Sequence, residues 1–168
     1  PAGVRAASEY FANYPEAKTI EIVPLGLWRK KETVTFVTGL GQGSYVKGSV
    51  EKPRSELKGK NIHKKTDDAV SEIKMEMTSI DEFVKERGLS RLDFIKLDIE
   101  GSELAALQGA RQSFLKFAPR FAICIYHKPE DIWTIPQFIK DLEKDGPRYE
   151  LYFGLHSQSP FSEMILYG

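Results

Sequence analysis

Between residues 73 and 153 the sequence alternates short β-rich runs with amphipathic stretches of helical length. One of these runs, RFAICIY at residues 120–126, is almost entirely apolar, which is typical of a strand buried on both faces of a parallel sheet. Strands that alternate with helices predict an α/β fold with right-handed crossovers. Because ligands bind beyond the carboxyl ends of the strands in such sheets, functional residues are expected where these strands end.

The apolar periodicity gives the expected position of each helix and strand. The first two strands are expected to form a hairpin, and the last two an antiparallel pair. Ser79 has the position of a helix N-cap and Gly88 that of a helix stop. Helices are expected at residues 3–13, 79–88, 102–117 and 132–142, and strands at residues 19–25, 33–38, 73–77, 92–99, 120–126, 149–153 and 161–167.

The composition limits the partners that the chain can have. Lys plus Arg total 24 and Asp plus Glu total 24, so no excess charge directs the 168 residues toward nucleic acid or an anionic membrane. The basic tract at residues 47–65 is interrupted by Glu51 and Glu56, which disfavours nucleic-acid binding. No apolar run has the roughly 18 to 20 residues that a membrane span needs. The single Cys124 excludes an internal disulfide and agrees with a cytoplasmic location.

Two short stretches invite a functional interpretation. The Gly-rich stretch GLGQGS at residues 39–44 predicts a loop and not a nucleotide site, because no helix is expected directly after it. The strand FIKLDIE is different, because a strand period of two puts Lys96, Asp98 and Glu100 on one face near its end. His127 follows the apolar strand RFAICIY, and an imidazole beside a carboxylate is a workable general base. The sequence therefore predicts a ligand site that includes Asp98 and His127.

Two other interpretations of these residues stay open. In the first, Lys96 and Asp98 form an ion pair with strand neighbours for structural reasons, while Glu100 and Glu103 merely favour the positive end of the following helix. In the second, Asp98, Glu100 and His127 bind a divalent cation through carboxylate oxygens and one imidazole nitrogen. Sequence spacing alone does not separate these interpretations from a catalytic site.

The segment at residues 78–110 resembles the FkbM family of S-adenosylmethionine-dependent methyltransferases. The family signature consists of a Leu-Asp or Ile-Asp helix start, a D-x-x-K-[IL]-D-[VI]-E-G strand and the pattern E-x-x-x-L-x-G-A. The likeness extends more weakly to EIVPLGLW at residues 21–28, to the strand at residues 120–127 and to the closing pair of strands. The matching residues are Ile80, Asp81, Asp93, Lys96, Leu97, Asp98, Ile99, Glu100, Gly101, Glu103, Leu107, Gly109 and Ala110.

The resemblance implies a Rossmann-like methyltransferase sheet, mostly parallel, with an antiparallel C-terminal strand pair. The family's first two strands, its Gly-rich cofactor loop and its ribose-binding acidic residue have no counterpart in the sequence. Residues 1–168 are therefore expected to form a single α/β domain that is incomplete on its N-terminal side. By analogy with the family, Leu25, Gly26 and Leu27 would lie on the adenine side of the cofactor, and Asp98 and Glu100 on the methyl side.

The function that the resemblance implies is transfer of a methyl group from S-adenosylmethionine to a hydroxyl of a sugar or other small metabolite. Asp98 or His127 would remove the proton, Lys96 would orient the carboxylates, and Glu100 would position the acceptor or a metal. One alternative is a non-catalytic binding or interaction domain derived from this fold, and another is a metal-assisted hydrolase that uses Asp98, Glu100 and His127. Because the cofactor loop is not found, the chain alone is expected to bind S-adenosylmethionine weakly or not at all.

Overall fold

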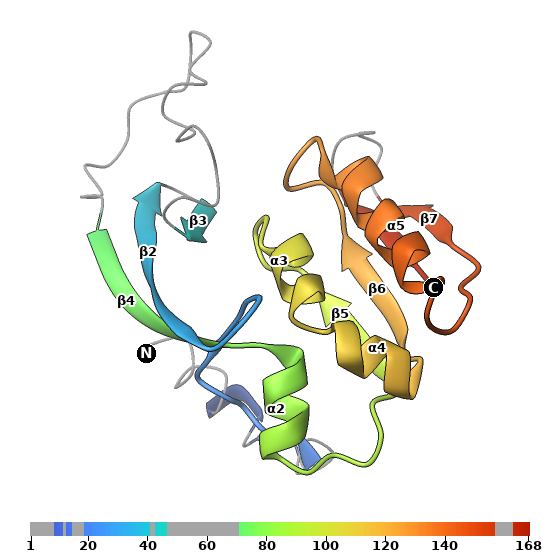
Figure 1. Ribbon diagram of the computed structural model, residues 1–168. Coiled ribbons are helices and arrows are strands. Elements are labelled where there is room, and N and C mark those ends of the chain that lie inside the picture. The colour runs from blue at the N-terminus through green and yellow to red at the C-terminus, as the bar shows by residue number, and fades with distance from the viewer. Residues whose placement is uncertain (1–8, 12, 15–18, 41–42, 47–70, 157–162) are drawn as a thin grey trace, which may run out of the picture.

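A computed structural model describes residues 9–11, 13–14, 19–40, 43–46, 71–156 and 163–168 of the chain (Figure 1). Strands and helices alternate in its C-terminal half. In chain order the elements are β1 (Gly26–Leu27), β2 (Glu32–Leu40), β3 (Gly43–Val46), β4 (Ser71–Thr78), α2 (Ile80–Glu86), β5 (Phe94–Leu97), α3 (Glu103–Gln108), α4 (Arg111–Phe117), β6 (Arg120–Cys124), α5 (Asp131–Leu142), β7 (Tyr152–Leu155) and β8 (Met164–Tyr167).

The described strands form two mixed sheets, which lie on the left and on the right of Figure 1. The first has the order β1-β4-β2-β3 and the second the order β5-β6-β8-β7. Only β1 with β4 and β5 with β6 pair in parallel among the described strands. The α/β class is confirmed, but the expected mostly parallel sheet does not describe these strands. Strands that are close in sequence, such as β2 with β3 and β7 with β8, pair antiparallel, because a short connection between neighbouring strands can only reverse the chain direction. The antiparallel C-terminal pair is confirmed.

The hairpin expected from residues 19–25 and 33–38 is wrong. Residues 20–25 lie outside any strand, and the short β1 pairs in parallel with β4, with Gly26 opposite Met77. Strand β2 pairs antiparallel with the other edge of β4, with Val34 opposite Met75. Pro24 is one reason why residues 20–25 form no strand, because proline has no N–H to donate to a strand ladder. The helix expected at residues 3–13 falls mostly outside the described residues, and of it residues 9–11 are helical.

Helix α2 begins where the sequence predicts. The Ser79 hydroxyl accepts a hydrogen bond from the Glu82 N–H at 3.1 Å, and the Glu82 carboxylate accepts one from the Ser79 N–H, so the two residues form a capping box. Gly88 lies just beyond the helix with a φ of 61°, a left-handed conformation that glycine adopts without strain. Both end signals of this helix are confirmed.

The helix expected at residues 102–117 is divided into α3 and α4. The division falls at Gly109, whose carbonyl accepts a hydrogen bond of 2.9 Å from the Asp81 N–H. The Asp81 carboxylate in turn accepts hydrogen bonds from the Gln112 N–H at 3.0 Å and from the Ser113 N–H at 2.7 Å, at the start of α4. Tertiary contacts with α2 thus replace the helical hydrogen bonds that a continuous helix would have made.

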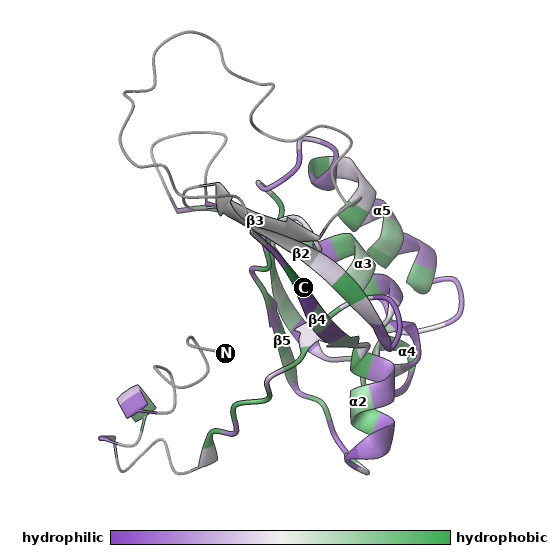
Figure 2. Cartoon of the chain, turned by 90° about the vertical axis from the view of Figure 1, so that its left-hand side faces the viewer, coloured by the Kyte–Doolittle hydropathy of each residue, from purple (hydrophilic) through white to green (hydrophobic). Residues whose placement is uncertain are grey.

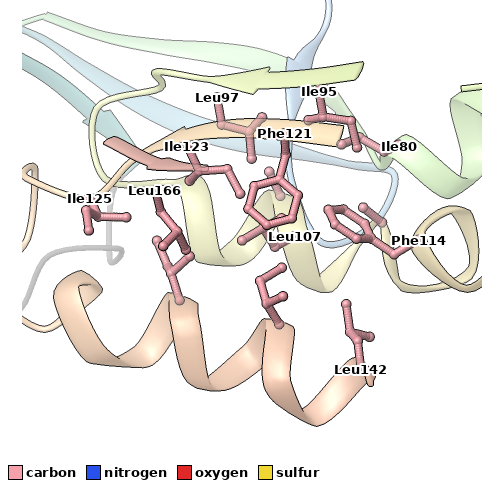
Figure 3. Packing of buried hydrophobic residues seen from close by; sticks show 14 of the residues in the cluster. Ile80, Ile95, Leu97, Leu107, Phe114, Phe121, Ile123, Ile125, Leu142 and Leu166 are labelled. Carbon is pink, nitrogen blue, oxygen red and sulfur yellow. The ribbon is translucent and has the colours of Figure 1, made fainter. Parts of the chain in front are cut away.

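The largest core lies between the second sheet and its helices. In Figure 2 the helices α2 to α5 lie on the same side of β5. Figure 3 shows Leu97, Phe121 and Ile123 of the strands directed toward Leu107 and Phe114 of the helices, and all of these side chains are buried. Across the part of the chain that the structure describes, no helix has the length and apolar character to cross a membrane.

Candidate active site at the carboxyl ends of β5 and β6

The parallel pairing of β5 with β6 brings their carboxyl ends together, because Leu97 lies opposite Ile123. The chain that leaves β5 carries Asp98 and Glu100, and the chain that leaves β6 carries His127. Nε2 of His127 lies 3.5 Å from Oδ1 of Asp98 and 3.9 Å from Oε2 of Glu100. The structure therefore brings the predicted carboxylates and the predicted imidazole into one cluster.

The turn between β5 and α3 has an unusual backbone. Glu100 has a φ of 55° and Gly101 a φ of 89°, so two consecutive residues have a left-handed conformation. This conformation is strained for a residue with a side chain such as Glu100, and such strain is concentrated at functional sites. A side chain on Gly101 would meet Cε of Lys128 at 3.0 Å. The left-handed backbone of the turn therefore favours glycine at position 101.

Glu103 is a site residue that the sequence did not predict. Its side chain is fully buried, and Oε1 lies 2.8 Å from Nδ1 of His127 and accepts a hydrogen bond of 2.8 Å from the Ile99 N–H. In the sequence, the helix dipole is a sufficient reason for an acidic residue in the first helical turn after β5. No local pattern indicates a contact with an imidazole 24 residues later. The available signal was its place in the pattern E-x-x-x-L-x-G-A.

The Lys96 ammonium group contacts two side chains, those of Cys124 and Asp98. Its Nζ lies 3.0 Å from Sγ of Cys124 and 3.5 Å from Oδ2 of Asp98. Oδ1 of Asp98 accepts a hydrogen bond of 3.3 Å from the Tyr126 hydroxyl. Lys96 and Asp98 therefore form an ion pair with each other, which holds the Asp98 carboxylate beside His127.

Burial and charge act in opposite directions on the titrating groups. Burial by itself lowers the pKa of His127, but the hydrogen bond to Glu103 and the charges of Glu103, Glu100 and Asp98 raise that pKa above its ordinary value. Burial by itself raises the pKa of Asp98, but the charge of Lys96 and further contacts hold it below its ordinary value. The cluster therefore favours a charged imidazole at His127 beside a charged carboxylate at Asp98.

Asp131, the first residue of α5, is a second buried acid near this cluster. Its side chain is 2% exposed. Burial, followed by repulsion from Glu103, raises the pKa of Asp131 to about 6. Oδ2 of Asp131 and Oε2 of Glu103 are buried, and among the described residues neither has a hydrogen-bond partner.

The residues expected on the adenine side lie in a different sheet. Gly26 and Leu27 form β1 and pair with β4 of the first sheet, and Leu25 precedes them. Asp98 follows β5 of the second sheet. The assignment of an adenine site to Leu25, Gly26 and Leu27 stays a prediction.

These features define a class of protein. The Asp98 carboxylate and the His127 imidazole, both with shifted pKa values, lie beyond the carboxyl ends of neighbouring parallel strands, which is the usual location of ligand sites in α/β enzymes.

Comparison with known protein families identifies the family to which the chain belongs. Residues 4–150 match the methyltransferase FkbM domain, so the chain belongs to this family. The crystal structure of methyltransferase FkbM from Methylobacillus flagellatus KT has a similar fold, with a TM-score of 0.62 and 19% sequence identity. The match covers 98% of this chain and 32% of that chain. No curated protein matches the sequence significantly.

Proposed function

We propose that the protein transfers a methyl group from S-adenosylmethionine to a hydroxyl oxygen of a sugar or another small metabolite. The observation that carries the proposal is the contact of His127 with Asp98 and Glu100 at the end of β5, in a chain that belongs to a methyltransferase family. A hydroxyl that accepts a methyl group loses its proton, and this cluster offers groups that can take it.

The half-exposed carboxylates fit one end of the methyl donor. The side chains of Asp98 and Glu100 are 49% and 46% exposed, so an approaching ligand can reach both. S-adenosylmethionine supplies, when bound, a methyl group that is already activated on a positive sulfonium. Carboxylates favour a positive charge nearby, so we assign Asp98 and Glu100 to the methyl side of the cofactor. The adenine side is assigned to Leu25, Gly26 and Leu27 by analogy with the family.

The remaining roles follow from the contacts around Asp98. Asp98, or His127 in its neutral form, takes the proton of the acceptor hydroxyl, while Glu100 positions the acceptor. Lys96, at 3.5 Å from Oδ2, holds the Asp98 carboxylate in place. Glu103 holds the imidazole ring through Nδ1, which leaves Nε2 directed toward Asp98. In-line alignment of the acceptor with the methyl group supplies the rest of the rate enhancement.

The proposal is tested with Asp98→Asn, which keeps the size of the side chain and removes its charge. The protein is incubated with S-adenosylmethionine and a panel of mono- and disaccharides, and the released S-adenosylhomocysteine is measured. We expect Asp98→Asn to lower the rate by about 10² or more, since general base catalysis contributes typically 10²- to 10⁴-fold. Circular dichroism should remain unchanged.

Asp93→Asn is the matched control, because Asp93 precedes the opposite end of β5 and pairs with Arg91 at the surface. This variant should keep the original rate. Turnover by Asp98→Asn at the rate of the unsubstituted protein would contradict the role of Asp98. Calorimetric titration with S-adenosylmethionine tests the alternatives. Micromolar binding would support the methyltransferase and would mean that another segment takes the place of the Gly-rich cofactor loop, whereas absence of both binding and turnover would favour a domain that only binds other partners.

A further inference from the structure

We propose that Asp98, Glu103 and His127 form a binding site for a divalent metal cation of the Mn²⁺ type. One donor atom from each of these three side chains lies within 4.8 Å of the other two. The ligand set considered from the sequence contained Glu100, whereas the structure places Glu103 in the set instead. The proposal does not rest on methyl transfer, because it concerns only the affinity of the cluster for an ion.

The first argument is the negative charge collected around one imidazole. Asp98 and Glu100 approach Nε2 of His127 at 3.5 and 3.9 Å, and Glu103 approaches Nδ1 at 2.8 Å. Lys96 contacts Oδ2 of Asp98, so Oδ1 remains on the side of the imidazole. A divalent cation held by Asp98, Glu103 and the neutral imidazole would balance the carboxylate charge that Lys96 leaves.

The second argument is an unsatisfied oxygen on one of the three side chains, Glu103. The Glu103 side chain is fully buried, and its Oε2 has no hydrogen-bond partner among the described residues. A buried carboxylate oxygen without a partner is unfavourable, and coordination to a cation would remove that cost. The other oxygen, Oε1, accepts the Ile99 N–H and therefore cannot swing away from the cluster without losing that bond.

The third argument is the geometry and chemistry of the donors. An ion about 2.1 Å from each ligand atom holds two such atoms roughly 3 to 4 Å apart. Rotation of the half-exposed Asp98 side chain can close the remaining gap if it gives up its contacts with Lys96 and Tyr126, whereas Glu103 and His127 are already fixed in the interior. Two carboxylates and one imidazole suit Mn²⁺, which accepts oxygen and nitrogen ligands. The carboxylate of Glu100, at 3.9 Å from Nε2, lies close enough to serve as a further oxygen ligand.

The test is a titration of the chain with MnCl₂, in which free Mn²⁺ is measured by electron paramagnetic resonance. No methyl donor or acceptor is present, so failure here is distinct from failure of the proposed methyl transfer. We expect one Mn²⁺ per chain in the unsubstituted protein. Asp98→Asn and His127→Gln should each weaken binding at least about tenfold, since even residues that only support a ligand change metal affinity by that factor.

Matched controls exist for both substitutions. Asp93→Asn and His156→Gln remove the same groups at sites outside the cluster, where Asp93 pairs with Arg91 and His156 contacts the Tyr167 hydroxyl. Both controls should bind Mn²⁺ like the unsubstituted chain. Absence of binding in the unsubstituted chain, or equal binding by Asp98→Asn, would overturn the proposal. Asp98 is half exposed, so its variant is expected to fold even if a substitution at the more buried His127 does not.

Discussion

At the scale of single residues, the site depends on a contact that no local pattern contains. Glu103 is fully buried and lies against Nδ1 of His127, although the two residues belong to different elements. The sequence correctly placed Asp98, Glu100 and His127 at strand ends, because the period of a strand and the position of its last residue are local properties. The burial of Glu103 follows from how α3 packs on the second sheet.

Asp131 gives a residue-scale prediction with a definite pH dependence. The pKa of Asp131 is raised from 3.8 to about 6, so the charged carboxyl destabilises the folded protein. The loss of folding stability begins as the pH rises above the ordinary pKa of an Asp carboxyl, and it is complete above the pKa that Asp131 has in the folded protein. Asp131→Asn should therefore raise the free energy of unfolding by about 1 to 2 kcal/mol at pH 7.5, and the gain should vanish near pH 4. Urea denaturation at both pH values, with a chelator present, measures the difference.

Asp141 on the same helix is the control of opposite sign. The hydrogen bond from Lys144 holds the pKa of Asp141 below its ordinary value, so its charge is favourable in the folded protein. Asp141→Asn should leave stability unchanged or lower it slightly at pH 7.5. A loss of stability in Asp131→Asn at pH 7.5 would mean that the Asp131 carboxylate has a favourable partner, which contradicts the argument from burial.

At the scale of elements, the break between α3 and α4 explains part of the family pattern. Gly109 packs against the carbonyl oxygen of Trp28, and a side-chain carbon built on it would lie 2.7 Å from Cβ of Ser79. The glycine in L-x-G-A is therefore required by the close approach of α3 to the chain after β1 and to the start of α2. Its φ of −83° is one that any residue adopts, so space and not backbone conformation decides its identity.

Gly109→Ala is the corresponding prediction. Alanine is the better helix former, but the added methyl group has no room between the packed elements. We expect a loss of about 1 to 3 kcal/mol in the free energy of unfolding, as for other overpacked sites. Gln108→Ala, at the exposed neighbouring position, should change stability by less than about 0.5 kcal/mol. A Gly109→Ala protein as stable as the Gln108→Ala control would show that the neighbouring elements can move apart freely.

At the scale of the whole molecule, three aromatic rings pack against one another and connect α4, the second sheet and the chain after α5. The ring of Phe114 lies 5.7 Å from that of Phe121 and 6.0 Å from that of Tyr149, and the last two rings are 5.2 Å apart. Phe114 is fully buried and Phe121 nearly so. Removal of one ring should leave a cavity that these fixed elements cannot close.

Phe114→Ala should therefore lower the free energy of unfolding by about 3 to 5 kcal/mol. A domain of this size is stabilised by roughly 5 to 15 kcal/mol, so the variant should unfold at a much lower urea concentration. Phe153→Ala is the control, because Phe153 is 57% exposed on β7 and its loss leaves no buried cavity. Similar urea midpoints for the two variants would contradict the placement of the core between the second sheet and its helices.

The sequence by itself determined the features that depend on neighbouring residues. Local conformational preferences account for the capping box of Ser79, for the glycine turn at Gly101 and for the strand ends that carry Asp98 and His127. A short connection accounts for the C-terminal strand pair. The family signature is also local, because it lies within residues 78–110. These features were sufficient to identify the α/β class and the family, and they predict the position of the site.

The tertiary structure alone decided which distant segments meet. The parallel register of β5 with β6 brings His127 to Asp98, and the packing of α3 brings Glu103 to His127. In the same way β4 pairs with both β1 and β2, in place of the hairpin that the sequence predicted. Strand pairing and burial depend on the free energy of the whole packed domain. A pattern of nearby residues therefore limits the possible contacts but does not select among them.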